Sequence, residues 1–261
     1  ILRLSGGGND ARLITNATTV TNGLGHTIDG AGQITASLVN NGVISAIETV
    51  FGNRLELIGG AKTNNSTMQA GPNAELFISG ITITQGPAGV IGANSDGTVI
   101  FNGSNTVTGG RILGSGTLLK PSSGNLALSD VSLEQDLDVA SNAGVIYNTP
   151  TFNCTGTIAL NDTSSANNAF IQFNANTTMM GGGRIFLGGS GNDSQVLTNA
   201  TTLTIAPDFT VEGSGQLLAS TINSGLIRSF LRGLGDGRLR LLSSAKPNHA
   251  HNNADPDAGT E

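Results

Sequence analysis

Apolar and polar residues alternate along this chain in short runs that are bounded by Gly, Asn or Asp. Typical runs are RLELI at 54–58, GTVIF at 97–101 and GRIFL at 183–187. A period of two with many β-branched residues predicts short β-strands. The most helix-like segment, 229–242, is interrupted by three glycines, and each glycine costs about 1 kcal/mol in a helix interior. The pattern therefore predicts an all-β protein.

One long block of the sequence occurs twice. Residues 2–47 align without a gap to residues 185–230, and 20 of the 46 aligned pairs are identical. The best-matched part is TNATTVT at 15–21 against TNATTLT at 198–204. In a sandwich or a closed barrel every strand has its own set of neighbours, so such a repeat has no evident geometric meaning. In a parallel β-helix each coil lies on an equivalent coil about 4.8 Å away, and any block can be reused along the axis.

We therefore predict that residues 1–244 form a right-handed parallel β-helix, a β-solenoid of roughly ten to twelve coils, assuming about 20–25 residues per coil. Its corners favour Gly and Asn, which tolerate positive φ, and Asn can stack on Asn of the next coil. If the two blocks are equivalent, Asn16 and Asn199 should occupy the same corner of the cross-section. Asn40 and Asn223 should do likewise, and His26 should overlay Phe209.

Composition limits the partners of this fold. Only 11% of residues are charged and the net charge is -6, which argues against binding of nucleic acid or of an anionic membrane. There is one cysteine and no run of 18 apolar residues, so a disulfide framework and a membrane span are excluded. The polar segment 245–261 has no strand pattern and is expected to be a disordered tail. Because the repeat pattern is already running at Leu2, we expect flanking repeats in a longer precursor.

Several runs resemble the repeats of secreted bacterial β-helix proteins. They are LVNNGVISA at 38–46, GRILGSGTLLKPSSGNLALSDV at 110–131 and STINSGLIRS at 220–229. They are similar to repeats of autotransporter passenger domains, filamentous-haemagglutinin-like adhesins and anchored exoproteins. The resemblance covers residues 2–244 and implies an extracellular or cell-surface location. It also implies an adhesive, spacing or matrix role toward a host-cell, matrix or polysaccharide surface, although some related solenoids cleave polysaccharides.

Carboxylates are the first candidates for a catalytic site. Enzymes built on parallel β-helices need two or three acids on one face, either to hold calcium or to perform acid/base hydrolysis. The one local cluster is Glu134, Asp136 and Asp138 in VSLEQDLDV at 131–139. In a single alternating strand these three would share a face, which is also the pattern of a solvated strand surface. Asp29 and Glu212 occupy equivalent positions in the two long repeats.

Glycine-rich segments suggest a calcium site as a second possibility. GGSGND at 188–193, ending in Asp193, fits most of the calcium-binding nonapeptide, and GGGND at 6–10 shares its Asp10. That motif needs tandem copies because each ion is shared between turns, whereas these segments lie 183 residues apart and the apolar eighth position is Gln195. A glycine-rich turn explains them as well. We predict no cofactor and no metal site, with Asp10 and Asp193 as the calcium candidates.

Histidine and cysteine offer little further chemistry. The counterpart of His26 is Phe209, which predicts a place for a ring rather than a catalytic base. Cys154 has no His or carboxylate partner in the sequence pattern and is expected to be a buried small residue. His249 and His251 lie near Asp255 and Asp257 in the polar tail and form a further candidate metal site.

Two functions of different classes follow. The first is an extracellular or cell-surface structural and adhesive segment without catalytic activity. The second is a carbohydrate-active β-helix that binds or cleaves a polysaccharide on one solvent-facing side. Carbohydrate grooves favour aromatic platforms, and the chain has no Trp and a single Tyr, which favours the first function.

Overall fold

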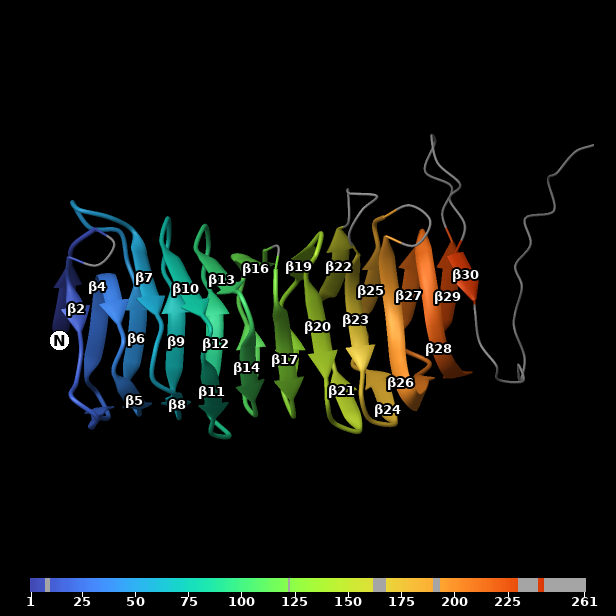
Figure 1. The fold of residues 1–261 in the computed structure, drawn as a ribbon, viewed down its shortest axis with the longest axis horizontal. Coiled ribbons are helices and arrows are strands. Elements are labelled where there is room, and N and C mark those ends of the chain that lie inside the picture. Colours follow the sequence, from blue (N-terminus) through green and yellow to red (C-terminus); the bar gives the residue numbers. More distant parts are fainter. Residues whose placement is uncertain (8–9, 122, 162–167, 190–192, 230–238, 242–261) are drawn as a thin grey trace, which may run out of the picture.

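In a computed structural model the chain forms an elongated parallel β-solenoid of about ten turns (Figure 1). The structure describes all residues except 8–9, 122, 162–167, 190–192, 230–238 and 242–261. The described residues contain strands and turns but no helix, as the alternation predicts. The strands lie across the long axis in chain order, from the N-terminal turn at one end to β30 at the other (Figure 1). At about 4.8 Å per turn, the rod is about 50 Å long. The right-handed sense of the coil stays a prediction.

Each turn contributes three strands, so the rod has three faces, which we name A, B and C in chain order. Face A contains β1 (Leu2–Ser5), β6 (Val43–Ala46), β9 (Thr67–Ala70), β12 (Val90–Ala93), β15 (Arg111–Leu113), β18 (Ser132–Glu134), β21 (Thr151–Asn153) and β24 (Thr177–Met180). Face B contains β2 (Arg12–Leu13), β7 (Arg54–Leu57), β10 (Glu75–Ser79), β13 (Thr98–Asn102), β16 (Thr117–Lys120), β19 (Leu137–Ala140), β22 (Thr157–Asn161), β25 (Arg184–Leu187), β27 (Thr210–Gly213) and β29 (Leu226–Ser229).

Face C contains β3 (Thr19–Asn22), β5 (Ser37–Asn40), β8 (Lys62–Asn64), β11 (Thr82–Gln85), β14 (Asn105–Thr108), β17 (Asn125–Ser129), β20 (Gly144–Tyr147), β23 (Ala169–Phe173) and β30 (Leu239–Leu241). Three strands continue around a corner: β4 (Thr27–Ile34) runs from face A to face B, and β26 (Ser194–Ile205) and β28 (Gly215–Asn223) run from C to A. Hydrogen bonding thereby joins the faces into a 17-stranded and a 13-stranded sheet. The pairing between named strands is parallel throughout, so every strand lies on its counterpart one turn away.

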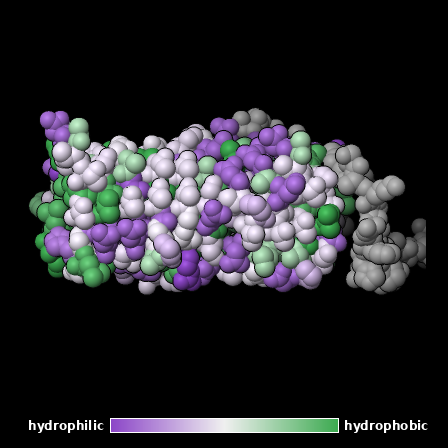
Figure 2. Space-filling model, turned by 90° about the horizontal axis from the view of Figure 1, so that it is seen from below, coloured by the Kyte–Doolittle hydropathy of each residue, from purple (hydrophilic) through white to green (hydrophobic). Residues whose placement is uncertain are grey.

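The core of the rod consists of the inward-pointing residues of all three faces. They are mostly Ile, Leu, Val and Ala, and nearly all are less than 5% exposed. Four aromatic rings from neighbouring turns, those of Tyr147, Phe152, Phe173 and Phe209, form a cluster in the interior with centroids 4.6–6.4 Å apart. Figure 2 shows that hydrophilic and intermediate residues cover most of one long side, whereas apolar residues gather at the N-terminal end.

Glycine residues form a column at the corner between faces A and B. Gly97, Gly116, Gly156 and Gly183 each precede a strand of face B, and none has a positive φ. A Cβ at Gly156 would instead lie 2.5 Å from the carbonyl oxygen of Gln135 in the neighbouring turn, and the other three meet a similar obstacle at 2.4–2.5 Å. These glycines are therefore required by the close approach of adjacent turns, and not by backbone conformation.

Stacked amides line the corner between faces C and A. The side chain of Asn22 donates to Asn40 (2.7 Å), Asn40 donates to Asn64 (2.9 Å), and Asn64 donates to Gln85 (3.1 Å). All four side chains are at most 6% exposed. Asn40 and Asn64 each also donate to a backbone carbonyl of the next turn at 2.9 Å. This amide ladder, the stacking of Asn that we predicted, satisfies polar groups that strand pairing does not reach.

Two lysines are buried at the corner between faces B and C, which the sequence did not predict. Lys62 and Lys120 are 1% and 0% exposed. The Lys62 ammonium donates to the carbonyls of Ala36, Ile58 and Gly60. The Lys120 ammonium donates to the carbonyls of Pro121 and Ser123, which directly follow it in the chain. Burial lowers the pKa of both lysines to about 8. Their role in the fold is to satisfy corner carbonyls.

The two copies of the long repeat have the same strand pairing. Leu2 pairs with Ile28 as Ile185 pairs with Val211, and the turns that end at His26 and Phe209 close with the same 3.0 Å backbone hydrogen bond. However, β1 belongs to face A and β25 to face B. The pairing leads from β1 through eight turns to β24, also on face A, and β25 follows β24 on face B. The second copy therefore begins eight turns and one face after the first.

Equivalent residues of the two copies therefore share a register but occupy different corners, contrary to our expectation for Asn16 and Asn199. Asn40 is fully buried in the amide ladder, whereas Asn223 is half-buried on the last turn of face A. His26 is exposed and its Nδ1 lies 2.9 Å from Asn22 Oδ1, whereas Phe209 is buried in the ring cluster. The expectation that one ring replaces the other in a shared environment is wrong.

The glycine column predicts a position-specific effect of adding one methyl group. Gly156→Ala should lower the free energy of unfolding by about 1–3 kcal/mol, because the new Cβ forces adjacent turns apart. Gly23→Ala is the matched control, since a Cβ there meets nothing within 4 Å and Gly23 has no positive φ. Denaturant unfolding of both variants tests the account, which fails if the two substitutions cost the same.

The amide ladder predicts a difference between adjacent asparagines. Asn64→Ala should lower the free energy of unfolding by about 2 kcal/mol or more, because it leaves buried partners in two neighbouring turns unpaired. Asn65→Ala removes only an exposed bond to Asn41 and should cost about 0.5 kcal/mol or less. Thermal melting of the two variants makes the comparison, and equal losses would contradict a structural role of the ladder.

Candidate functional site

The acid cluster identified in the sequence is divided by a corner. Glu134 ends β18 on face A and Asp138 lies in β19 on face B. Between them Gln135 is buried and donates to the Gly116 carbonyl. Buried residues alternate with the acids along the segment, as predicted. The prediction that Glu134, Asp136 and Asp138 share one face is wrong, because the segment bends at Gln135.

Glu134 is engaged by a cation from the neighbouring turn. Arg111 lies beside Ser132 in the parallel pairing, and its Nε donates to Glu134 Oε1 at 2.7 Å. Ser132 donates to the same oxygen at 3.0 Å. The hydrogen bonds from Arg111 lower the pKa of Glu134 below its ordinary value, although partial burial opposes the shift. This carboxylate stays ionised at neutral pH and links two turns on face A.

Asp29 forms a similar link on face A. Arg3 of β1 donates to both carboxylate oxygens, with distances of 2.9 and 2.8 Å. This fork lowers the pKa of Asp29, again against a contribution from burial. Asp29 is 7% exposed, so its carboxylate has little contact with solvent beyond the guanidinium that covers it.

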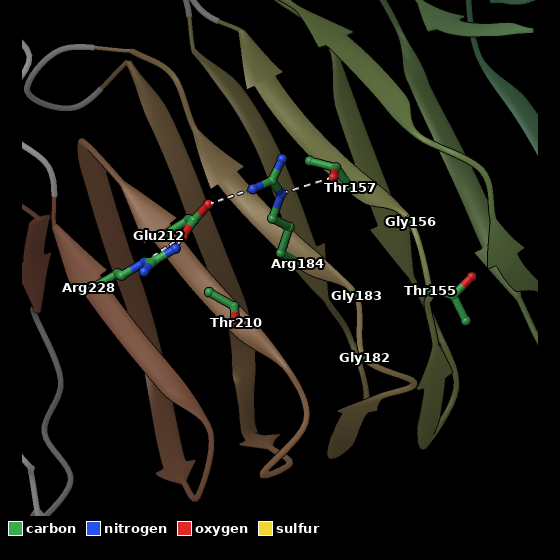
Figure 3. Close-up of a pocket in the computed structure, with 9 residues that line it drawn as sticks. All are labelled: Thr155, Gly156, Thr157, Gly182, Gly183, Arg184, Thr210, Glu212 and Arg228. Carbon is green, nitrogen blue, oxygen red and sulfur yellow. Dashed lines mark hydrogen bonds and ion pairs between the residues drawn. The ribbon is translucent and has the colours of Figure 1, made fainter.

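Glu212, the counterpart of Asp29 in the second repeat, lies on face B between two arginines (Figure 3). Its side chain is 3% exposed, whereas those of Arg184 and Arg228 are about half exposed. Arg184 comes from β25 and bonds to Oε1 at 3.0 Å; Arg228 comes from β29 and bonds to Oε2 at 2.7 Å. The buried carboxylate thus fixes two guanidinium groups that extend from the turns on either side.

Two adjoining hollows surround this triad on face B. The first has a volume of about 280 Å³ and is shown in Figure 3. Its lining residues are Thr155, Gly156, Thr157, Gly182, Gly183, Arg184, Thr210, Glu212 and Arg228. The second, of about 400 Å³, is lined by Asp136, Asp138, Thr157, Ala159, Asn161, Arg184, Phe186 and Glu212. Because Thr157, Arg184 and Glu212 belong to both, the hollows are parts of one depression, which we call the face-B groove.

Small residues contribute to this depression. Asp138, Ala159 and Phe186 follow one another in a single row of the parallel pairing. The methyl group of Ala159 leaves space between the carboxylate on one side and the ring on the other. Gly156 and Gly183, which belong to the glycine column, widen the other hollow at its edge.

Two exposed acids of the groove accept hydrogen bonds from the following turn. Asp136 and Asp138 are both exposed. Asp136 Oδ1 accepts a hydrogen bond from the Thr157 amide at 2.6 Å, and Asp138 Oδ1 accepts one from the side-chain amide of Asn161 at 3.1 Å. Sequence reasoning identified these acids but missed Thr157, Arg184 and Phe186. The only local signal for the missed residues is the alternation in their strands, which indicates that they point outward. Alternation does not show which residues of the neighbouring turn lie beside them.

The other predicted candidates lie away from the groove. Asp10 is exposed in the first turn, whereas Asp193 is 5% exposed directly before β26, eight turns along the rod. Among the described residues no group of three His, Cys, Asp or Glu side chains could hold a metal ion. Cys154 is fully buried, and burial raises the pKa of its thiol to about 12. His249, His251, Asp255 and Asp257 lie outside the described residues.

Comparison with known proteins gives no family assignment. No family model, no curated protein and no solved structure matches the chain. Within the described residues, no helix has the length and apolarity required to cross a bilayer. The fold is thus established as a parallel β-solenoid, and the groove stands as a candidate on its own geometry.

The arginine–glutamate triad predicts a stability difference between two glutamates on face B. Glu212→Gln should lower the free energy of unfolding by about 1–3 kcal/mol, because a buried carboxylate with two charged partners is replaced by an amide. Glu75→Gln makes the same change in charge, but Glu75 forms a more exposed pair with Arg54. This substitution should lower the free energy of unfolding by about 0–1 kcal/mol. Denaturant unfolding at low salt measures both, and a smaller loss at Glu212 than at Glu75 would refute the role of the triad.

Proposed function

We propose that this chain is an extracellular or cell-surface rod with a structural and adhesive role and without a catalytic centre. The observation that carries the proposal is the use of acidic residues in the fold. The pairs Arg3–Asp29, Arg54–Glu75 and Arg111–Glu134, and the triad around Glu212, each join a carboxylate to an arginine of an adjacent turn. These acids form ion pairs that link one turn of the rod to the next.

The pKa shifts support a non-catalytic reading of the same acids. Glycoside hydrolysis needs a general acid with a raised pKa opposite a second carboxylate. The pKa values of Asp29 and Glu134 are instead lowered by their arginines, so both remain ionised at neutral pH and neither can supply a proton. They also lie on face A, whereas Asp136 and Asp138 face the groove on the other side of the corner.

The shape and surface of the rod suit an adhesive or spacing segment. Turns of similar construction follow one another over about ten repeats, and hydrophilic and intermediate residues cover most of the long side in Figure 2. Only 11% of the residues are charged. Such a rod holds its ends apart and offers a long face to a partner. The extracellular location is inferred from the resemblance of its repeats to those of secreted bacterial β-helix proteins.

A carbohydrate-active enzyme is the second candidate function. The observation that favours it is that Asp136 and Asp138 both line the face-B groove, with Arg184 on the same surface. Acids and an arginine together are the groups that calcium-assisted or acid/base cleavage of a polysaccharide would require.

A pair of assays distinguishes the two functions. The purified chain should cause no turnover of pectic or other acidic polysaccharides, with or without calcium, while binding saturably to cells or extracellular matrix. Turnover that is abolished by Asp136→Asn or Asp138→Asn, but not by the control Asp96→Asn at an exposed corner, would establish the enzyme instead. Absence of both turnover and saturable binding would refute the adhesive role.

A further inference from the structure

We propose that the face-B groove binds a neutral polysaccharide along the axis of the rod. The inference rests on the proposed adhesive function and assigns it a site and a ligand class. It depends on three properties of the groove: the mixture of donors and acceptors in its lining, its near balance of charge, and the row of side chains on which a sugar chain would lie.

The lining offers donors and acceptors side by side. Arg184 and Asn161 present donor groups, and Asp136 and Asp138 present acceptor oxygens. The Thr157 hydroxyl accepts a hydrogen bond from Arg184 Nε at 3.0 Å and can donate its own hydrogen. A sugar hydroxyl also donates one hydrogen bond and accepts others, so a chain of hydroxyl groups needs this mixture. The Asp138–Asn161 pair, joined at 3.1 Å, holds an acceptor and a donor next to each other at the exposed edge.

The charges in the groove oppose highly charged ligands of either sign. Arg184 and Arg228 contribute two positive charges, and Asp136, Asp138 and Glu212 contribute three negative charges. A polyanion would meet the two exposed aspartates, and a polycation would meet the two half-exposed guanidiniums. The near balance therefore favours a neutral polar ligand, whose binding gains little from long-range electrostatics.

The row that contains Ala159 supplies the shape. Asp138 and Phe186 lie two turns apart, a distance of about 10 Å along the rod, and the only side chain between them in this row is the methyl group of Ala159. The half-buried Phe186 ring borders this space and can pack against the apolar face of a sugar ring. In the other direction the row continues through Leu119, Ile100 and Phe77, all half-buried on the outside of face B.

This row bears on the argument that the chain, with no Trp and a single Tyr, lacks an aromatic platform for a carbohydrate. The single tyrosine is buried in the core, but Phe77 and Phe186 point outward on the face that contains the groove. Both belong to one row of the parallel pairing, but the guanidinium of Arg54 lies over the Phe77 ring, 4.7 Å from its centroid. Phe186 is therefore the ring that an extended ligand along the rod would contact. The groove is open to solvent at its edge, as binding to an internal part of a long polymer requires.

Filling the groove tests the site. Ala159→Phe places a ring in the space between Asp138 and Phe186, in a row that already contains Leu119 and Phe186. Ala127→Phe is the matched control, because Ala127 is also half-buried, outward-facing and in the middle of a strand, but on face C. The probes are immobilised galactomannan, mixed-linkage β-glucan and arabinogalactan. Wild type and Ala127→Phe should bind at least one of them, and Ala159→Phe should bind about tenfold more weakly or not at all.

A smaller substitution guards against a folding defect. Asn161→Ala should also weaken binding. Asn174→Ala, which removes exposed bonds to Asn148 and Gln172 on another surface, should not. Thermal melting of each variant establishes that it is folded. The retained fraction should change less than about twofold between 50 and 500 mM salt, because the ligand is neutral.

Several outcomes would overturn the inference. They are a lack of binding to all three neutral polysaccharides, equal binding by wild type and folded Ala159→Phe, and preferential, salt-sensitive binding to polygalacturonate or polylysine. If wild type and Ala159→Phe adhere equally to cells or matrix, the groove assignment fails while the adhesive function stands. If wild type binds neither cells, matrix nor any polysaccharide, both proposals fail.

Discussion

Parallel hydrogen bonding between successive turns is the constraint on which this structure depends. It fixes the spacing of turns at about 4.8 Å and gives each paired residue inside the rod a defined neighbour in the turn before and the turn after. At that spacing an amide can donate to the amide of the next turn, as Asn22, Asn40 and Asn64 do. The same spacing leaves no room for a Cβ at Gly156 or Gly183. Polar ladders, glycine columns and arginine–carboxylate links are therefore results of one geometric rule.

Much of the fold could be predicted because the relevant information is local. Alternation over four or five residues identifies a strand wherever it lies, and RLELI, GTVIF and GRIFL correspond to β7, β13 and β25. The leading glycine of GTVIF and GRIFL marks the corner between faces A and B, whereas Asn53 takes that place before RLELI. The stacking of asparagines could also be predicted, since in a solenoid equivalent corners necessarily lie on each other.

The candidate site could not be predicted to the same extent, because its contacts join different turns of unequal length. Thr27 pairs with a residue 16 positions later, Val43, whereas Thr151 pairs with one 27 positions later, Thr178. Without a constant period, the sequence does not reveal that Arg184 and Arg228 meet at Glu212. Nor does alternation show where a strand bends, so the corner at Gln135 that separates Glu134 from Asp138 was missed.

Because the long repeat returns after eight turns and one face, duplication in this rod also rotates what it copies. The buried carboxylate that Asp29 places on face A reappears as Glu212 a third of the way around the circumference, where its arginines border a groove. Sequence duplication can thus move a feature from one side of a rod to another without any change in the strands that carry it. An engineer could use the same screw displacement deliberately, by inserting one strand and one corner to redirect every surface beyond the insertion.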